Sequence, residues 1–319
     1  MNAPTAITDA AALPTLPMRL AAAWNSDVGW SFRHSPVAIV SAIVLGVCLA
    51  GALFAPWIAP HNPFDLRTLS LLDALAPPVG MDGSKAGYVL GTDDQGRDVL
   101  SAIMFGTRIS LLVGLASVAL AIVLGVSLGL VAGYAGGKLD AFIMRVADVQ
   151  LSFPAILIAL LIDGVARAVL PRDSHSSVAL FVLIFAIGAA NWVQYARTVR
   201  GSTMVEKNKE YIQAARVIGI SSFGIMRRHL LPNVLGPVLV LATINIASAI
   251  ITEATLSFLG VGVPPTQPSL GTLIRVGNDF LFSGEWWIAI FPGAALVIMV
   301  LAINLLGDWM RDALNPKLR

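Results

Sequence analysis

Residues 109–137, ISLLVGLASVALAIVLGVSLGLVAGYAGG, contain no Asp, Glu, Lys or Arg along their whole length. About 20 apolar residues are enough for a helix to cross the hydrocarbon core of a bilayer, so this stretch predicts a transmembrane helix. The rest of the 319-residue chain agrees, because 56% of its residues are hydrophobic and only 13% are charged. A soluble domain carries about 25% charged residues. The composition therefore excludes a soluble enzyme and predicts an all-α membrane protein.

Five further apolar segments bring the number of predicted spans to six. Three of them also lack Asp, Glu, Lys and Arg, and a fourth, which is 45 residues long, contains Glu253 as its only charged residue. The remaining segment is apolar overall but contains Arg145, Asp148 and Asp163. In chain order, the six spans are predicted within residues 35–64, 109–137, 141–165, 174–196, 230–274 and 286–307.

The Lys and Arg residues predict how these spans are oriented. If the N-terminus is cytoplasmic, the cytoplasmic segments carry 13 basic residues and the outer segments carry 7. Cytoplasmic loops of membrane proteins carry an excess of Lys and Arg. Both termini are therefore predicted to lie in the cytoplasm, and the most basic loop, from Arg197 to Arg228, lies there too.

The sequence lacks the motifs of common enzymes. It contains no G-x-x-x-x-G-K-[ST], so we expect no ATP to bind through a P-loop. A G-x-S-x-G elbow and an H-E-x-x-H motif are also absent. Cys48 is the only cysteine, the four histidines show no metal-ligand spacing, and a net charge of +2 indicates no nucleic-acid partner. We expect a protein that is no enzyme by itself and binds no cofactor or metal.

The cytoplasmic loop at residues 197–232 has a distinct pattern. Residues 209–218 predict a short amphipathic helix, and Gly219 suits the left-handed position that ends a helix. Ser222 can cap a second helix, which Pro232 interrupts before the next span. The predicted apolar face of the first helix consists of Tyr211, Ala214, Ala215 and Ile218. Such a knob fits a groove in a partner, although an ordinary basic loop at the membrane surface explains the charges equally well.

This loop resembles the EAA loop of ABC importer permeases. The resemblance lies in Gln213-Ala-Ala215, then Gly219 after three residues, and His229-Leu-Leu-Pro232 after nine more. Gln213 stands where the family usually has Glu, and His229 where it usually has Ile; Arg-His-hydrophobic-Leu-Pro-Asn is common in the peptide-importer branch. In that family the loop docks into a cleft of a cytoplasmic ATPase. The resemblance thus assigns ATPase coupling to Glu210, Gln213, Ala214, Ala215, Gly219, Leu231 and Pro232.

Three further segments resemble the C-type permeases of dipeptide and oligopeptide importers: residues 91–111, 145–154 and 253–262. The resemblance implies the type I ABC importer permease fold, with six spans and a coupling helix between spans four and five. It also implies the bacterial inner membrane as the location. Importers of nickel, glutathione and antibiotic peptides share these motifs, so the solute stays open.

The resemblance further implies a set of partners. These are a second homologous permease, two cytoplasmic P-loop ATPases that use ATP and Mg²⁺, a periplasmic substrate-binding protein, a peptide substrate and the surrounding lipid. ATP binding would close the ATPase pair, move the coupling loop and switch the spans between inward- and outward-facing states by rigid-body motion.

These inferences divide the chain into five parts. They are a cytoplasmic N-terminal tail (1–34), a first transmembrane helix (35–60), a periplasmic loop with an interfacial helix (61–105), a permease core (106–308) and a cytoplasmic C-terminal tail (309–319).

The periplasmic loop carries a candidate contact for the binding protein. Thr92 and Gln95 have the spacing of a capping box, which predicts a short helix at the outer membrane surface. The candidate contact residues are Asp93, Asp94, Arg97 and Asp98. The alternative is that this helix only seals the outer end of the bundle, since amphipathic stripes mostly anchor helices.

Four polar residues within the spans could line the pathway or hold helices together. Arg145 and Asp148 are three residues apart, so they can pair on one helix face, and Pro154 should kink that helix. Glu253 lies near the outer end of span five, where it either meets a peptide amino group or bonds backbone amides of the following turn. Asn245 is either a pathway residue or part of a helix–helix contact.

Two other classes of function stay open from the residues alone. A proton-coupled secondary transporter would use Asp148 and Glu253 as proton carriers and need no ATPase. A membrane anchor or assembly factor would transport nothing. The coupling loop and the lack of duplicated halves argue against the first of these, and the charges within the spans argue mildly against the second.

Overall fold

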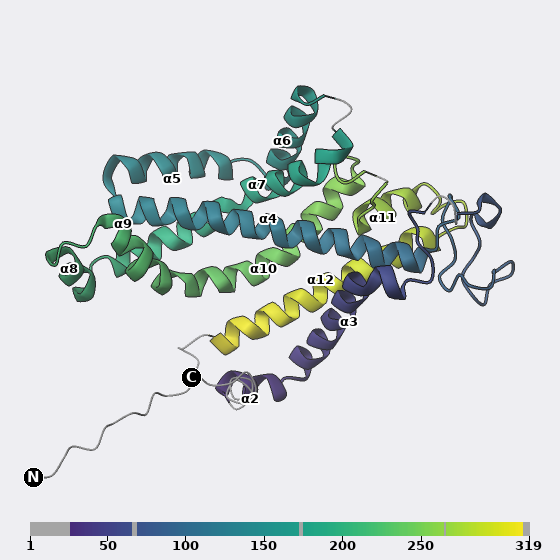
Figure 1. Ribbon diagram of the computed structural model, residues 1–319, viewed down its shortest axis with the longest axis horizontal. Coiled ribbons are helices and arrows are strands. Elements are labelled where there is room, and N and C mark those ends of the chain that lie inside the picture. The colour runs from purple at the N-terminus through teal and green to yellow at the C-terminus, as the bar shows by residue number, and fades with distance from the viewer. Residues whose placement is uncertain (1–25, 66–68, 172–174, 265, 315–319) are drawn as a thin grey trace, which may run out of the picture.

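The computed structural model describes residues 26–65, 69–171, 175–264 and 266–314 and shows a bundle of long α-helices (Figure 1). No β-strand occurs within these ranges. The helices are α2 (Asp27–Arg33), α3 (Pro36–Ile58), α4 (Val99–Ala135), α5 (Gly137–Leu151), α6 (Ala155–Val169), α7 (His175–Glu206), α8 (Glu210–Val217), α9 (Ser222–Ile225), α10 (Leu231–Phe258), α11 (Leu270–Asn278) and α12 (Trp287–Leu314), with a π-helical segment, Met226–Leu230, between α9 and α10.

Five helical segments of the described chain are long and apolar enough to cross a membrane. They are α3, α4, α7, the continuous segment Ser222–Phe258 and α12. The pair α5 and α6 passes the same test together, although the two helices meet at 94°. If this bent pair is one span, the chain has the six predicted spans. The predicted all-α membrane fold is confirmed.

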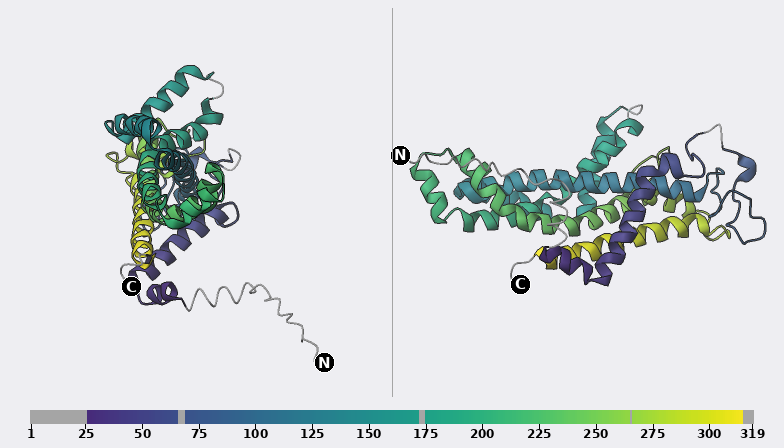
Figure 2. Two further views of the ribbon diagram at one scale, coloured as in Figure 1. Left: turned by 90° about the vertical axis from the view of Figure 1, so that its left-hand side faces the viewer. Right: turned by 60° about the horizontal axis from the view of Figure 1, so that its bottom comes forward.

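The centre of the bundle is the parallel pair α4 and α7, which pack closely because α4 presents Gly125, Gly129 and Gly133, spaced four residues apart, to α7. A Cβ atom on Gly125 would lie 2.5 Å from the carbonyl oxygen of Trp192, and one on Gly129 would lie 2.4 Å from that of Ala196. Small residues with this spacing let the backbones of transmembrane helices come into contact. The remaining spans are arranged around this pair (Figure 2).

The bend between α5 and α6 is larger than the predicted kink. Pro154 has no N–H to continue the helix, and its ring disfavours helical geometry at Phe153. Helix α5 therefore ends at Leu151, and α6 restarts at Ala155 in a new direction. The kink was therefore predicted at the right residue, but the proline breaks the helix in two.

The first span begins and ends close to its predicted limits, but the second does not. Helix α4 starts at Val99, where the side chain of Asp98 accepts a hydrogen bond from the backbone N–H of Ser101 at 3.0 Å. It therefore runs across the expected boundary between residues 105 and 106. The polar residues Thr107, Arg108 and Ser110 do not interrupt it, and Thr107 bonds back to the carbonyl oxygen of Ile103.

The short helices lie at opposite ends of the long bundle. Helices α8 and α9 form a knob at one end, and the loops before α4 lie with α11 at the other (Figure 1). Helices α3 and α12 pack together beside the core, and Trp309 of α12 donates a hydrogen bond to the hydroxyl of Ser31 in α2 at 3.3 Å. The two ends carry the sequence motifs and are described next.

Candidate coupling site and outer loop

The knob between α7 and α10 folds as helix, turn, helix. Helix α8 ends at Val217, and Gly219 adopts a φ of +83°, as predicted for a residue that ends a helix. The backbone N–H of Ile220 then bonds to the carbonyl oxygen of Ala215 at 3.0 Å. Ser221, not Ser222, caps the following helix, because its hydroxyl accepts the N–H of Gly224 at 3.2 Å.

The buried face of α8 differs from the predicted one. Ile212 and Ala215 are buried, whereas Tyr211, Ala214 and Ile218 are exposed. Ile212 and Ala215 join the main hydrophobic cluster, so only a narrow stripe of this eight-residue helix faces the bundle. Of the four residues expected on that face only Ala215 is buried, because the buried stripe passes through Ile212 instead of Tyr211 and because α8 ends before Ile218.

Three hydrogen bonds fix α8 to the two spans that flank it. The hydroxyl of Tyr211 donates to a carboxylate oxygen of Glu206, at the end of α7, at 2.7 Å. The side-chain amide of Asn233, at the start of α10, donates to the Tyr211 hydroxyl oxygen at 3.2 Å, and Lys209 pairs with Glu206 at 2.7 Å. Desolvation and the adjacent Glu206 carboxylate raise the pKa of Tyr211 to about 12, so the phenol stays protonated.

The knob is also tied to the end of α4. Lys207 donates a hydrogen bond to the carbonyl oxygen of Gly133 at 2.7 Å, and the Arg216 guanidinium lies 5.3 Å from the centre of the Tyr134 ring. The loop is therefore braced against α4, α7 and α10, and a force on the knob reaches all three spans.

Among its charged and polar side chains, the knob also exposes three large apolar ones. Val217 is 90% exposed, Ile218 76% and Phe223 68%. Among the residues assigned to coupling, Glu210, Gln213, Ala214, Gly219 and Pro232 are exposed, Leu231 is partly buried and Ala215 is buried. We call Val217, Ile218 and Phe223 the apolar cap.

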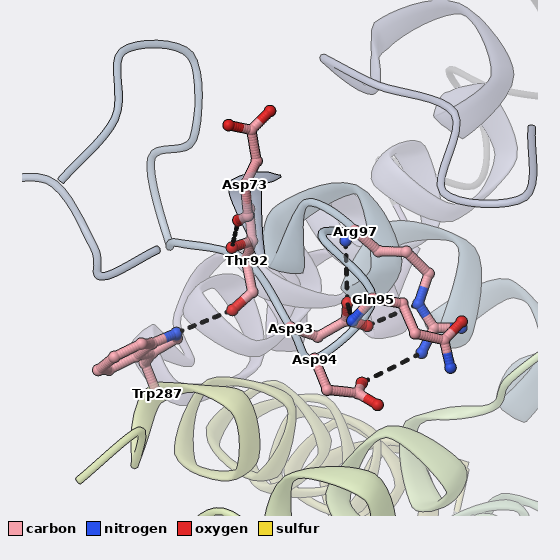
Figure 3. Close-up of polar contacts among 7 residues, drawn as sticks. All are labelled: Asp73, Thr92, Asp93, Asp94, Gln95, Arg97 and Trp287. Atoms are coloured by element: carbon pink, nitrogen blue, oxygen red, sulfur yellow. Dashed lines mark hydrogen bonds and ion pairs between the residues drawn. The ribbon is translucent and has the colours of Figure 1, made fainter. Parts of the chain in front are cut away.

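At the opposite end, the segment at Thr92 is a compact loop and not the predicted interfacial helix. The Thr92 hydroxyl accepts the N–H of Ala76 at 2.8 Å and donates to the carbonyl oxygen of Asp73, while its own carbonyl oxygen accepts the indole N–H of Trp287 at 3.1 Å (Figure 3). The capping-box interpretation was wrong, because Thr92 bonds to residues far along the chain rather than to Gln95.

Most of the predicted binding-protein contacts are buried in this loop. Arg97 pairs with Asp93 at 2.6 Å, and Asp93 also accepts the backbone N–H groups of Gln95 and Arg97 at 2.9 Å (Figure 3). The side chains of Asp93, Arg97 and Asp98 are almost fully buried, whereas Asp94 is partly exposed. Three of the four candidates are thus buried within the loop. Of the four, only Asp94 has a side chain that a docked protein could reach.

Asp94 makes the stability of this loop depend on pH. Burial, followed by the nearby Asp93 carboxylate, raises the pKa of Asp94 above its ordinary value. The folded state therefore binds this proton more tightly than the unfolded state, and stability falls as the pH rises from about 4 through the raised pKa. In the Asp94→Asn variant we expect the melting temperature not to fall in this way as the pH rises. Thermal unfolding in detergent between pH 4 and 7 measures this for both proteins. Parallel profiles for the two proteins would contradict this.

Glu253 is fully buried, at 0% exposure, between α4, α10 and α11. Its carboxylate accepts the hydroxyl of Ser110 at 2.8 Å and that of Ser257 at 2.7 Å. These hydroxyl oxygens in turn accept the backbone N–H groups of Leu270 at 3.2 Å and Val263 at 3.4 Å. The carboxylate thus reaches the amides of the following turn through two serines, which the sequence alone did not indicate.

Asn245 lies in a polar cluster in the core of the bundle. It lines a small space with Ser117, Asn191 and Tyr195, which come from α4 and α7. The Ser117 hydroxyl, the Tyr195 hydroxyl and the Asn245 amide nitrogen are buried and have no hydrogen-bond partner among the described residues. The cluster therefore joins the three central spans at a polar point in their packing.

The expected pair of Arg145 and Asp148 does not form. Asp148 instead pairs with Arg197 of α7 at 2.5 Å, and both side chains are about half exposed. The partner comes from the neighbouring helix, which spacing along one helix does not reveal. Arg145 is exposed.

Comparison with known proteins agrees with this architecture. Residues 125–319 match the family described as binding-protein-dependent transport system inner membrane component, and residues 23–78 match the N-terminal transmembrane domain of oligopeptide transport permease C. The first match covers more than half of the chain, so the chain belongs to this family of membrane permeases.

Its relatives include proteins named as peptide permeases. It is 37% identical, over 91% of both chains, to the di/tripeptide transport system permease protein DppC of Pseudomonas aeruginosa. It is 40% identical, over 90% of this chain and 91% of the relative, to the dipeptide transport system permease protein DppC of Escherichia coli.

The solved structure of the MetNI methionine ABC transporter shares the fold. One of its chains superimposes with a TM-score of 0.52 over 67% of this chain and 96% of that chain, at 22% identity. This similarity confirms the predicted permease fold of ABC importers.

Proposed function

We propose that this chain is one permease subunit of an ATP-driven importer of dipeptides or oligopeptides in the bacterial inner membrane, with both termini in the cytoplasm. The names of its relatives support the peptide class of substrate. In this proposal the chain itself binds no nucleotide. ATP and Mg²⁺ are used by two partner ATPases, and a periplasmic binding protein delivers the peptide.

The braced knob with its exposed apolar cap is the observation that carries this proposal. An exposed apolar cluster on a small helical projection is typical of a protein contact site. The knob lies at one end of the bundle (Figure 1). A protein on the opposite side of the membrane would dock at the other end, near α11. An ATPase bound to the cap would lie next to the basic residues that mark the cytoplasmic side.

The braces supply a path for mechanical coupling. When the ATPases close on ATP, α8 would move with them, and the bonds from Tyr211 to Glu206 and Asn233 would pull on α7 and α10. The close contact between α4 and α7 would make these spans move as one body. Rigid-body rotation against a second permease then opens the pathway to the other side.

Co-purification tests the assembly. We would tag the chain in its native host, solubilise the membranes in mild detergent and identify the bound proteins by mass spectrometry. The proposal predicts a second permease and P-loop ATPases in the purified complex, with ATPase activity that rises when binding protein loaded with dipeptide is added. Purification of the chain alone, or only with copies of itself and no ATPase, would overturn the proposal.

A further inference from the structure

Three polar side chains meet in the interior of the central spans. Ser117 comes from α4, Tyr195 from α7 and Asn245 from α10, and all three are at least nine-tenths buried. Ser117 is 18 residues from Val99 and 18 from Ala135, the two ends of α4. Each distance corresponds to about 27 Å of helix. The three side chains therefore lie well inside the bundle, away from both of its ends.

These side chains do not bond to one another in the described arrangement. The hydroxyls of Ser117 and Tyr195 and the amide nitrogen of Asn245 have no hydrogen-bond partner within the described ranges. They line one small space, in which the Asn245 amide is next to the Tyr195 hydroxyl. This space has no room for a water molecule, so water cannot supply the missing bonds.

Such a cluster destabilises the described arrangement. Nearly all buried polar groups in folded proteins have a hydrogen-bond partner, because an unpaired group loses its bonds to water and gains none in return. The variants Tyr195→Phe and Ser117→Ala would keep nearly the same packing without that cost. Polar residues at these positions are therefore explained by a second arrangement of the same helices, in which their polar atoms meet.

Helix α10 is held near both of its ends, and Asn245 lies between the two attachments. Near one end, Glu253 accepts the hydroxyl of Ser110 in α4 at 2.8 Å. Near the other end, Asn233 donates to the hydroxyl oxygen of Tyr211 in the knob at 3.2 Å. Asn245 is 8 residues from Glu253 and 12 from Asn233, which on a helix correspond to about 12 and 18 Å. A pull on the knob would tilt α10 about its attachment to α4 and move Asn245 relative to the glycine-packed pair of α4 and α7.

We propose that Asn245 is a latch for a second arrangement of the central spans. When α10 tilts, the amide nitrogen of Asn245 donates its two hydrogens to the hydroxyl oxygens of Tyr195 and Ser117, so that all three unpaired groups gain a partner. These bonds stabilise only the second arrangement and therefore shift the population of the chain toward it. The inference rests on the proposed function, because the transport cycle supplies the second arrangement. The three side chains touch no substrate and act as positioning residues.

Removal of a single hydroxyl tests the latch. In the complex purified with Tyr195→Phe, we expect a melting temperature no lower than that of the unmodified complex, because this hydroxyl has no partner to lose among the described residues. ATP-driven uptake of labelled dipeptide into proteoliposomes that contain the binding protein should slow about three- to tenfold, which is the usual effect of one lost hydrogen bond between neutral groups. A hydroxyl with a merely structural role would instead lower the melting temperature when it is removed.

Two further variants sharpen this test. Tyr88→Phe is the matched control, because it removes a hydroxyl that donates to Asp73 at 3.5 Å in the loop before α4. We expect it to cause no rise in melting temperature and to leave uptake unchanged. Asn245→Ala removes both proposed bonds and should slow uptake at least as much as Tyr195→Phe. The double variant should be no slower than Asn245→Ala alone, since both changes remove the same bond.

The outcomes separate the latch from the proposed function. A clear fall in melting temperature for Tyr195→Phe would show that its hydroxyl is already bonded in the described arrangement. Unchanged uptake, or additive losses in the double variant, would show that Tyr195 and Asn245 do not pair during transport. Each of these results overturns the latch and leaves the proposed function intact. If the unmodified complex takes up no peptide with ATP, both fail. Slower uptake at an unchanged or raised melting temperature, without additive loss, supports the latch.

Discussion

Replacing Val217 by Asp is expected to abolish ATP-driven uptake while the permease still inserts and folds. Val217 is 90% exposed in the apolar cap, so the variant removes no internal packing. In the assembled importer the same side chain would be covered by an ATPase, and a charge buried unpaired in an interface costs about 2 to 5 kcal/mol. Since 1.4 kcal/mol is a factor of ten, ATPase association should weaken by at least roughly 30-fold. Co-purified ATPase per permease measures this directly.

The chain offers a closely matched control for this variant. Leu72, in the loop at the other end of the bundle, is also 90% exposed. Leu72→Asp adds the same charge at the same exposure, and we expect it to leave ATPase association unchanged. Equal ATPase recovery with Val217→Asp and the unmodified chain would rule out the apolar cap as the docking surface.

Removal of the Glu253 carboxylate is expected to have the largest effect on stability. Glu253→Ala leaves the hydroxyls of Ser110 and Ser257 without their acceptor and creates a cavity where α4, α10 and α11 meet. Each serine hydroxyl left without its acceptor costs about 1 to 3 kcal/mol, and the cavity adds to this, so a total loss of about 3 to 5 kcal/mol is expected. We expect a large fall in melting temperature in detergent, together with loss of the complex.

Glu253→Gln separates this structural role from a role in the pathway. The amide oxygen can still accept one serine hydroxyl, while its nitrogen forces the other hydroxyl to turn, so a loss of about 1 to 2 kcal/mol is expected. Ser248→Ala, at an exposed position on the same helix, should change neither stability nor assembly. If Glu253→Ala melts at the temperature of the unmodified chain but transports no peptide, Glu253 acts in the pathway instead.

The sequence predicted the parts of this fold that depend on local pattern. The uncharged apolar runs located the spans, and Gly219 was correctly assigned to the left-handed end of α8. The basic loop was correctly read as helix, turn, helix, because these elements follow from local propensity and chain geometry. Even Pro154 was recognised, although its consequence is a break of 94° and not a kink.

The contacts between distant residues could not be predicted in this way. Asp148 pairs with Arg197 and not with Arg145, and the carbonyl oxygen of Thr92 accepts a hydrogen bond from Trp287, while Thr92 caps no helix. Ser110 was not recognised as a partner of Glu253, because 143 positions separate the two residues. Such pairs depend on how the helices pack, which no short-range spacing encodes. Ile212 and the Tyr211 brace were missed for the same reason, and a single apolar residue between polar neighbours was the sole signal for Ile212.

Transport by the purified complex in proteoliposomes tests the central claim most directly. The vesicles would contain this chain with its co-purified partners, the binding protein and labelled dipeptide, and would be energised either by ATP and Mg²⁺ or by an imposed proton gradient. If the chain belongs to an ATP-driven peptide importer, the dipeptide accumulates only when ATP and the binding protein are present, and accumulation persists when a protonophore is added. Accumulation driven by the proton gradient without ATP, and abolished by the protonophore, would contradict the account.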